Sequence, residues 1–226
     1  MKLKKITIMA LAATLSLSAA ACGGKSESTT AAPAATTEAK KDTTEKAPKE
    51  LPAPEDIDAA IQKALGEGYL AVIEVPEDEI IMTPLRDLDM TKVDAYVAKQ
   101  SKVSSVDPDT VMIVKCKDAA YADEIVKSFN EAFAQAMDYA RQYPYNVAKV
   151  EGTRIYKIND TVMYIVGGAR AAEGASEEDA AKLAESEYEK IDEAIRIACG
   201  SLPENLAVMT EPEQKVNGDG TPVVGG

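Results

Sequence analysis

The sequence of 226 residues contains no histidine and no tryptophan, and only two phenylalanines. Without histidine, this chain alone has neither a Ser-His-Asp nor a Cys-His catalytic mechanism, and it offers no imidazole ligand to a metal ion. The sequence also contains neither a phosphate-binding P-loop nor a dinucleotide-binding fingerprint. Any catalysis would therefore depend on carboxylates, lysine, tyrosine, serine or cysteine. The sequence predicts no metal site and no cofactor.

Positive charge is scarce as well. The chain has 25 lysines and arginines against 38 aspartates and glutamates, which gives a formal net charge of −13. A chain this acidic repels phosphate backbones, so we expect no nucleic-acid partner. Hydrophobic residues make up 46% of the sequence, enough for a substantial core, and the length suits one domain with extensions.

Cysteine is rare, and its count is odd: Cys22, Cys116 and Cys199 are the three cysteines. At least one of them therefore has a role other than an intramolecular disulfide. Cys116 and Cys199 could form one disulfide in an extracellular protein, or they could be two buried thiols. The sequence has no C-x-x-C motif, so a redox role has little support.

The N-terminus has the three parts of a secretory signal peptide. Lys2, Lys4 and Lys5 give a positive start, residues 6–17 are apolar, and residues 18–21 are small. The apolar run, even when extended to residue 21, is shorter than the roughly 20 residues that a membrane-spanning helix needs. We therefore predict a signal peptide over residues 1–21 rather than a transmembrane helix.

The residues around Cys22 resemble the bacterial lipobox, in which a lipid is attached to a cysteine directly after the cleavage site. Ala19 stands where the lipobox usually has leucine, while Ala20, Ala21 and Cys22 follow the pattern. The resemblance implies a chain anchored to the extracytoplasmic face of the cell membrane by acyl chains, such as palmitate, on Cys22. The alternative is ordinary secretion, with Cys22 incidental.

Residues 22–54 comprise the lipidated cysteine and a disordered tether. Residues 25–55 have one large aliphatic residue and no aromatic residue, so this stretch cannot bury enough surface to offset its ordering entropy. Its mean reach is on the order of 30 Å. Residues 210–226 are rich in glycine and proline and predict a flexible tail.

Residues 55–209 predict one α+β domain. Helical periodicity covers residues 54–65, 118–143 and 176–199, and strands are expected at residues 69–75, 93–103, 110–117, 152–158 and 161–166. The strand at 110–117 is apolar on both faces, which places it centrally in the sheet. We expect a small antiparallel sheet with a β-β-α-β-β core, packed against one long helix, with additional N- and C-terminal helices.

The core of this domain, residues 93–168, resembles a domain of unknown function that occurs in lipoproteins of Gram-positive, Clostridia-like bacteria. Four features carry the resemblance: Tyr96 in the first strand, an aliphatic strand ending at Lys115, Tyr143-Pro144 after the long helix, and the hairpin residues Tyr164-Ile165-Val166. The resemblance implies an extracytoplasmic address and approximate domain boundaries. It implies no activity and supplies no catalytic residues.

Tyrosines provide the main candidate for a binding site. Tyr143, Tyr145, Tyr156 and Tyr164 lie close together in the sequence around the end of the long helix and the hairpin. They could form the walls of a cleft for a sugar or a peptide. The alternative is that they fill the edge of the core with their hydroxyls in water.

Taken together, these patterns predict a membrane-anchored lipoprotein whose domain binds a small ligand or an envelope protein. Two other functions stay open: an envelope hydrolase that uses two carboxylates, and a structural spacer in the wall. A cleft would favour a small ligand, a flat apolar patch would favour a protein partner, and a domain with neither would favour the spacer. Whether the chain is an enzyme is left open.

Overall fold

The computed structural model describes residues 51–77, 79, 84, 88–104, 106–142 and 146–209. The predicted signal peptide, Cys22, the tether up to residue 50 and the predicted tail lie outside the described residues. Tyr143 and Tyr145 lie outside them as well. None of the described helices is long and apolar enough to cross a membrane.

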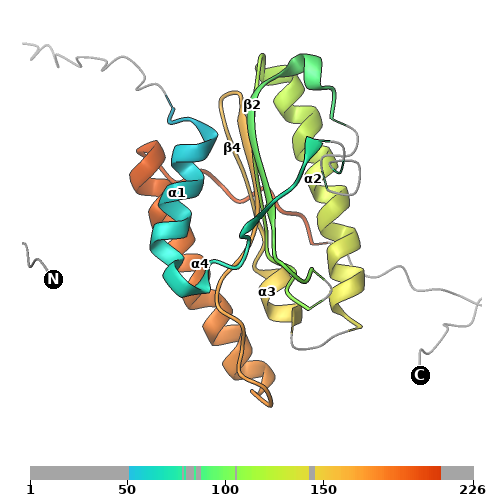
Figure 1. The fold of residues 1–226 in the computed structure, drawn as a ribbon, viewed down its shortest axis with the longest axis vertical. Coiled ribbons are helices and arrows are strands. Elements are labelled where there is room, and N and C mark those ends of the chain that lie inside the picture. The colour runs from blue at the N-terminus through green and yellow to red at the C-terminus, as the bar shows by residue number, and fades with distance from the viewer. Residues whose placement is uncertain are drawn as a thin grey trace, which may run out of the picture. The chain divides into compact units, whose positions relative to one another are not determined.

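The described residues form an antiparallel sheet between two layers of helices (Figure 1). Helices α1 (Pro54–Leu65) and α4 (Glu177–Cys199) cover one face, and α2 (Ala119–Ala140) covers the other. The strand order is β1-β2-β3-β5-β4. The strands are β1 (Ile73–Glu74), β2 (Val93–Gln100), β3 (Thr110–Cys116), β4 (Arg154–Ile158) and β5 (Thr161–Val166). The predicted α+β class, with an antiparallel sheet and helices as the first and last elements of the domain, is confirmed.

Strand β3 lies at the centre of the sheet, as its uninterrupted apolar residues predict. Val111 and Ile113 pack toward α1 and α4, whereas Met112 and Val114 pack toward α2. Because helices cover both faces, both sets of side chains leave water and the strand needs no polar side.

Local sequence explains where the helices begin and end. Helix α1 has Pro54 at its first position and ends at Gly66, whose φ is 55°. Asp118 caps α2 by accepting a hydrogen bond from the Tyr121 amide at 2.8 Å. Ser176 caps α4 by accepting a bond from the Asp179 amide at 3.1 Å, and α4 ends at Gly200, with φ 81°.

Three elements differ from the prediction. Strand β1 has only two residues, and β2 ends at Gln100; the Ser101 amide still donates to the Asp109 carbonyl, and the chain turns after it. Helix α3 (Val147–Glu151) was not predicted, since five residues are too few to display a helical period. Two single-turn 3₁₀ helices, η1 (Gly66–Gly68) and η3 (Met90–Lys92), complete the described elements.

The antiparallel register brings the ends of three strands together at one end of the sheet. Gln100 is paired with Thr110, and Thr110 is paired with Val166. The loop of residues 101–109 and the loop of residues 167–176 therefore leave the sheet side by side, next to α3 and the beginning of α4. This end of the sheet holds the polar groups described next.

Candidate functional site

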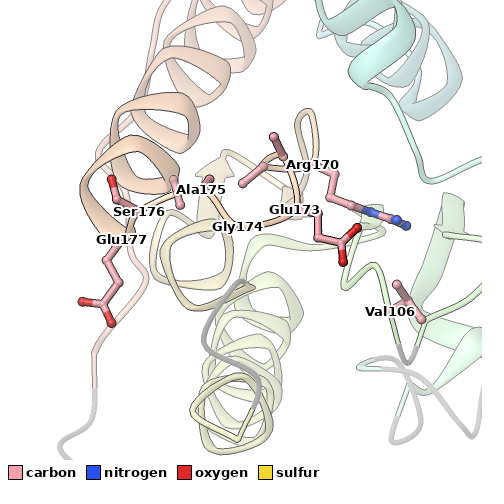
Figure 2. A pocket seen from close by; sticks show the side chains of 10 residues that line it. Val106, Arg170, Glu173, Gly174, Ala175, Ser176 and Glu177 are labelled. Atoms are coloured by element: carbon pink, nitrogen blue, oxygen red, sulfur yellow. The ribbon is translucent and has the colours of Figure 1, made fainter.

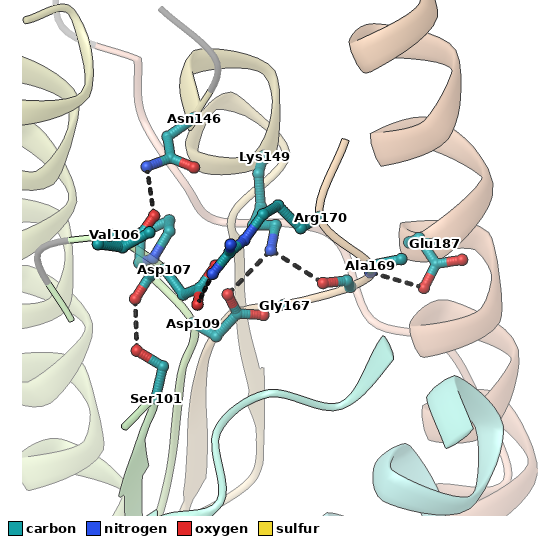
Figure 3. Close-up of polar contacts among 12 residues, drawn as sticks. Ser101, Val106, Asp107, Asp109, Asn146, Lys149, Gly167, Ala169, Arg170 and Glu187 are labelled. Carbon is teal, nitrogen blue, oxygen red and sulfur yellow. Dashed lines mark hydrogen bonds and ion pairs between the residues drawn. The ribbon is translucent and has the colours of Figure 1, made fainter. Parts of the chain in front are cut away.

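Two ion pairs join the loops at this end of the sheet (Figure 3). Arg170 donates from Nε to Asp107 Oδ1 at 2.7 Å and from Nη2 to Asp107 Oδ2, so the pair is bidentate. Lys149 of α3 donates from Nζ to Asp109 Oδ2 at 2.9 Å. We call these four residues the ionic cluster. The contacts tie α3 and the loop after β5 to the loop before β3.

Asp109 is the most deeply buried member of the ionic cluster, with 1% of its surface exposed. Desolvation raises the pKa of its carboxyl to about 6, and the attraction of Lys149 offsets only part of that effect. Asp109 Oδ1 is buried without a hydrogen-bond partner among the described residues. The desolvation of this carboxylate is therefore incompletely compensated.

The turn at Gly167–Ala169 is held by side chains from two helices. Lys149 donates to the Gly168 carbonyl at 2.9 Å, and Glu187 Oε2 accepts from the Ala169 amide at 3.0 Å. Gly168 has φ 116°, and a Cβ there would lie 2.6 Å from Glu187 Cβ. Only glycine combines this backbone conformation with such close packing. The turn is therefore rigidly positioned at the base of the loop that follows it.

A pocket of about 660 Å³ lies beside Arg170 of the ionic cluster (Figure 2). The loop of residues 170–175 forms one wall, the first turn of α4 forms another, and Val106 contributes from the loop before β3. Alanine side chains supply much of the surface, including Ala180, while Arg170, Glu173 and Ser176 supply polar groups. The volume lies within the range of small-molecule sites, which are mostly apolar with a few polar groups. We call this site the α4 pocket.

The ionic cluster does not itself line the α4 pocket, apart from Arg170. Asp109 has the raised pKa of a general acid, and Asp107 lies close enough to influence it. Both carboxylates are, however, bound to cations, and neither reaches the pocket surface. The cluster can therefore hold the pocket walls in place, but its carboxylates do not contact a ligand in the α4 pocket. The described residues contain no group of acids or cysteines arranged to hold a metal ion.

A second polar centre lies between α1 and β2, on the β1 side of the sheet. Asp58 of α1 is 3% exposed; its Oδ1 accepts from the Tyr69 hydroxyl at 2.5 Å and its Oδ2 accepts from Lys99 Nζ at 2.7 Å. Burial, together with the hydrogen bond to Asp58, raises the pKa of Tyr69. A groove of about 600 Å³ lies beside this trio, between α1 and strands β1 and β2. We call it the α1–β2 groove.

The structure separates the two candidate tyrosines that it describes. Tyr156 is buried on the α1–α4 face, where its hydroxyl donates to Asp192 Oδ1 at 2.6 Å. Tyr164 is buried on the α2 face, with its ring centroid 5.4 Å from that of Phe129. Successive positions along paired strands point to opposite faces, so these two side chains do not share a cleft. Tyr143 and Tyr145 lie outside the described residues.

The structure also keeps Cys116 and Cys199 apart. Both are free thiols, Cys116 in the core on the α2 face and Cys199 against the core on the α1–α4 face. Burial raises the pKa of Cys116 to about 11, so its thiol is protonated and unreactive at neutral pH. The sheet between the two cysteines explains why the disulfide considered from the sequence does not form.

The residues that build the site were missed because each looks ordinary in the sequence. Asp107 and Asp109 belong to a predicted turn, and Gly167-Gly168 marked only the end of a strand. Lys149 lies 40 positions after Asp109, so no local pattern connects them. The one available signal was a pair of aspartates directly before a strand that is buried on both faces, where each carboxylate needs a cation.

Comparison with known proteins identifies one feature. Residues 74–167 match a protein family described as Domain of unknown function (DUF4358). No curated protein and no solved structure matches the chain significantly. The matched residues run from the end of β1 to the first glycine after β5, so they include Asp107, Asp109 and Lys149. A DUF4358 domain is thus found at residues 74–167, within the described α+β fold.

Proposed function

We propose that this chain is a membrane-anchored extracytoplasmic lipoprotein whose α+β domain acts as a binding module at the cell envelope. The sequence supports the location: a basic start, an apolar run and small residues lead to Cys22. Acyl chains on Cys22 would hold the mature chain in the membrane. The stretch up to residue 54 would connect the anchor to the domain.

The α4 pocket is the observation that carries the binding role. It is a hollow of about 660 Å³, and the Arg170–Asp107 pair joins its loop wall to the loop that carries Val106. A pocket with walls fixed in advance loses little conformational entropy when a ligand enters, which favours binding. A spacer would require no such pocket. A small ligand with an apolar body and polar ends fits this lining best.

The experiment is affinity capture from intact cells that make the lipidated chain, with recovery of both bound proteins and bound small molecules by mass spectrometry. We expect a specific molecule to accompany the native chain. Cys22→Ala should release the chain from the membrane and reduce capture of membrane-bound partners. Absence of any specific molecule, with either chain, would contradict the proposal.

A pair of neighbouring substitutions tests the pocket itself. Ala180→Leu places a larger side chain in the α4 pocket, whereas Ala181 is exposed on the next position of α4 and is not part of the lining. We expect Ala180→Leu to abolish retention of the small molecule and Ala181→Leu to leave it unchanged. Equal retention by both variants would show that the ligand binds elsewhere.

A further inference from the structure

Two of the polar side chains that line the α4 pocket are already engaged within the fold. Arg170 binds Asp107 through two nitrogens, so the guanidinium has its counter-charge in the neighbouring loop. Ser176 Oγ accepts from the Asp179 amide at 3.1 Å and donates to Asp179 Oδ2 at 2.7 Å. Neither side chain needs a ligand to balance its charge or to complete the helix cap.

The other two polar side chains of the lining are the carboxylates of Glu173 and Glu177. Both residues are exposed, and neither carboxylate makes a hydrogen bond or ion pair with another residue in the part of the chain that the structure describes. Glu178, the next residue of α4, differs because it accepts from Lys182 Nζ at 2.6 Å. The groups that the pocket offers to a ligand are therefore anionic acceptors.

The two carboxylates lie at opposite ends of the labelled lining in Figure 2. The Glu173 side chain extends toward Val106, whereas the Glu177 side chain extends the other way from the first turn of α4. The rest of the lining includes Ala171, Ala172, Ala175 and Ala180. A ligand that reaches both carboxylates must therefore cross an apolar surface.

The charge of the pocket favours a cation. Arg170 and Asp107 neutralise each other, so Glu173 and Glu177 leave the lining negative. The N-terminus of α4 carries about half a positive charge, which the three acidic residues of its first turn outweigh. The whole chain has a net charge of −13. An anionic ligand would be repelled and a cationic ligand attracted.

We propose that the α4 pocket takes an aliphatic diamine, with one ammonium group at Glu173, the other at Glu177 and the carbon chain along the alanines. The inference rests on the proposed binding role and names the chemical class of its ligand. It does not depend on anchoring through Cys22. An amine with a single charge would leave one carboxylate unpaired, so the second ammonium group adds affinity.

The test is a series of diamines from 1,4-diaminobutane to 1,10-diaminodecane, titrated into the full chain in detergent at low salt and followed by calorimetry. We expect an optimum length, because both ammonium groups reach a carboxylate only when the carbon chain spans the gap. The best diamine should bind about threefold more tightly than the monoamine of equal length, a typical effect of one exposed ion pair. The diol of equal length should bind about tenfold more weakly, since it forms neither pair.

Substitutions locate the two ammonium groups. Glu173→Gln and Glu177→Gln should each weaken binding of the best diamine about threefold, and should weaken binding of the monoamine less, because it can use the other end. Glu185→Gln removes the same charge from an exposed position of α4 outside the lining, and should leave diamine binding unchanged. Ala180→Leu should abolish binding.

Three results would overturn the inference. They are no diamine binding, affinity independent of chain length, and equal effects of Glu173→Gln and Glu185→Gln. The last two would mean that amines bind the acidic surface as a whole. Retained binding in Ala180→Leu would likewise place the amine outside the pocket.

The failure of this inference is distinguishable from that of the proposed function. An uncharged molecule captured from cells, and lost in Ala180→Leu, would support the binding role of the α4 pocket and overturn the diamine. Diamine binding to the purified chain, without capture of any specific molecule from cells, would support the ligand class and contradict only the envelope function.

Discussion

At the scale of single residues, Asp109 carries the one buried side-chain oxygen without a hydrogen-bond partner in the part of the chain that the structure describes. Its carboxylate has one cation, Lys149, and one oxygen without a partner. Burial of a charge is strongly unfavourable unless a counter-charge and hydrogen bonds replace the lost water. The pair therefore contributes less to stability than its short distance suggests, but the loss of either member is damaging.

The first prediction concerns Lys149→Met, which leaves the Asp109 carboxylate buried without a cation. We expect the free energy of unfolding to fall by about 3–5 kcal/mol, measured by urea denaturation. Lys182→Met is the matched control, because Lys182 pairs with Glu178 at the surface of α4. That variant should change stability by less than about 0.5 kcal/mol. Equal effects of the two substitutions would contradict the account.

The second prediction concerns pH. The pKa of Asp109 is about 6 in the folded chain, against about 3.9 for an unfolded aspartate. Between these values the folded chain binds more protons than the unfolded chain, so the contribution of Asp109 to stability falls as pH rises from about 4 to 6. Relative to Asp109→Asn, the native chain should lose about 1–3 kcal/mol of unfolding free energy across this window. A constant difference, or one that grows with pH, would show that the carboxylate is well compensated.

The third prediction compares two glycines with positive φ. Gly168→Ala should destabilise the fold by about 2–4 kcal/mol, because the positive φ strains an alanine backbone and the new Cβ clashes with the Glu187 side chain. Gly174, with φ 79° and no atom within 4 Å of the position that a Cβ would take, provides the control. Gly174→Ala should destabilise by only about 1–2 kcal/mol. Thermal or urea unfolding of both variants measures the difference, and equal losses would mean that the Gly168 turn is not tightly packed.

At the scale of elements, the chain after α4 protects the outer edge of the sheet. The Leu206 amide donates to the Ile155 carbonyl at 2.7 Å, and Asn205 Oδ1 accepts from the Ile155 amide at 2.9 Å. Asn205 Nδ2 also donates to the Thr153 carbonyl at 3.0 Å. Residues after Gly200 thus satisfy the edge of β4, while the edge of β2 beyond β1 has no such cover among the described residues.

The fourth prediction follows from this contrast. Asn205→Ala should remove the side-chain bonds to β4 and destabilise the fold by about 1–2 kcal/mol. Hydrogen exchange at the Ile155 amide should become faster. Glu204→Ala, at the exposed neighbouring position, should change neither quantity. An unchanged exchange rate at Ile155 in the Asn205 variant would mean that the segment does not protect this edge.

Helices and strands with a clear period were predictable, and pairings between distant residues were not. The range of α1, the central position of β3 and the caps at Ser176 and Gly200 follow from local sequence. The Lys149–Asp109 and Lys99–Asp58 pairs depend on how the strands are ordered, which a period cannot reveal. The candidate tyrosines lie close together in the sequence, but alternation along paired strands places Tyr156 and Tyr164 on opposite faces.

At the scale of the whole molecule, the proposed function joins a lipid anchor at Cys22 to a domain that carries the α4 pocket. The α4 pocket is lined largely by alanine, and its volume suits a small ligand. The sign of the net charge keeps such domains apart from one another and favours basic partners.

Anchoring through Cys22 is the central claim, and one measurement tests it most directly: the intact mass and N-terminal sequence of the chain purified from bacterial membranes. The account predicts a chain that begins at Cys22 and whose mass is increased by a diacylglycerol group. The Cys22→Ala variant should lack this increase in mass. An unmodified Cys22, or a chain that begins at any other residue, would contradict it.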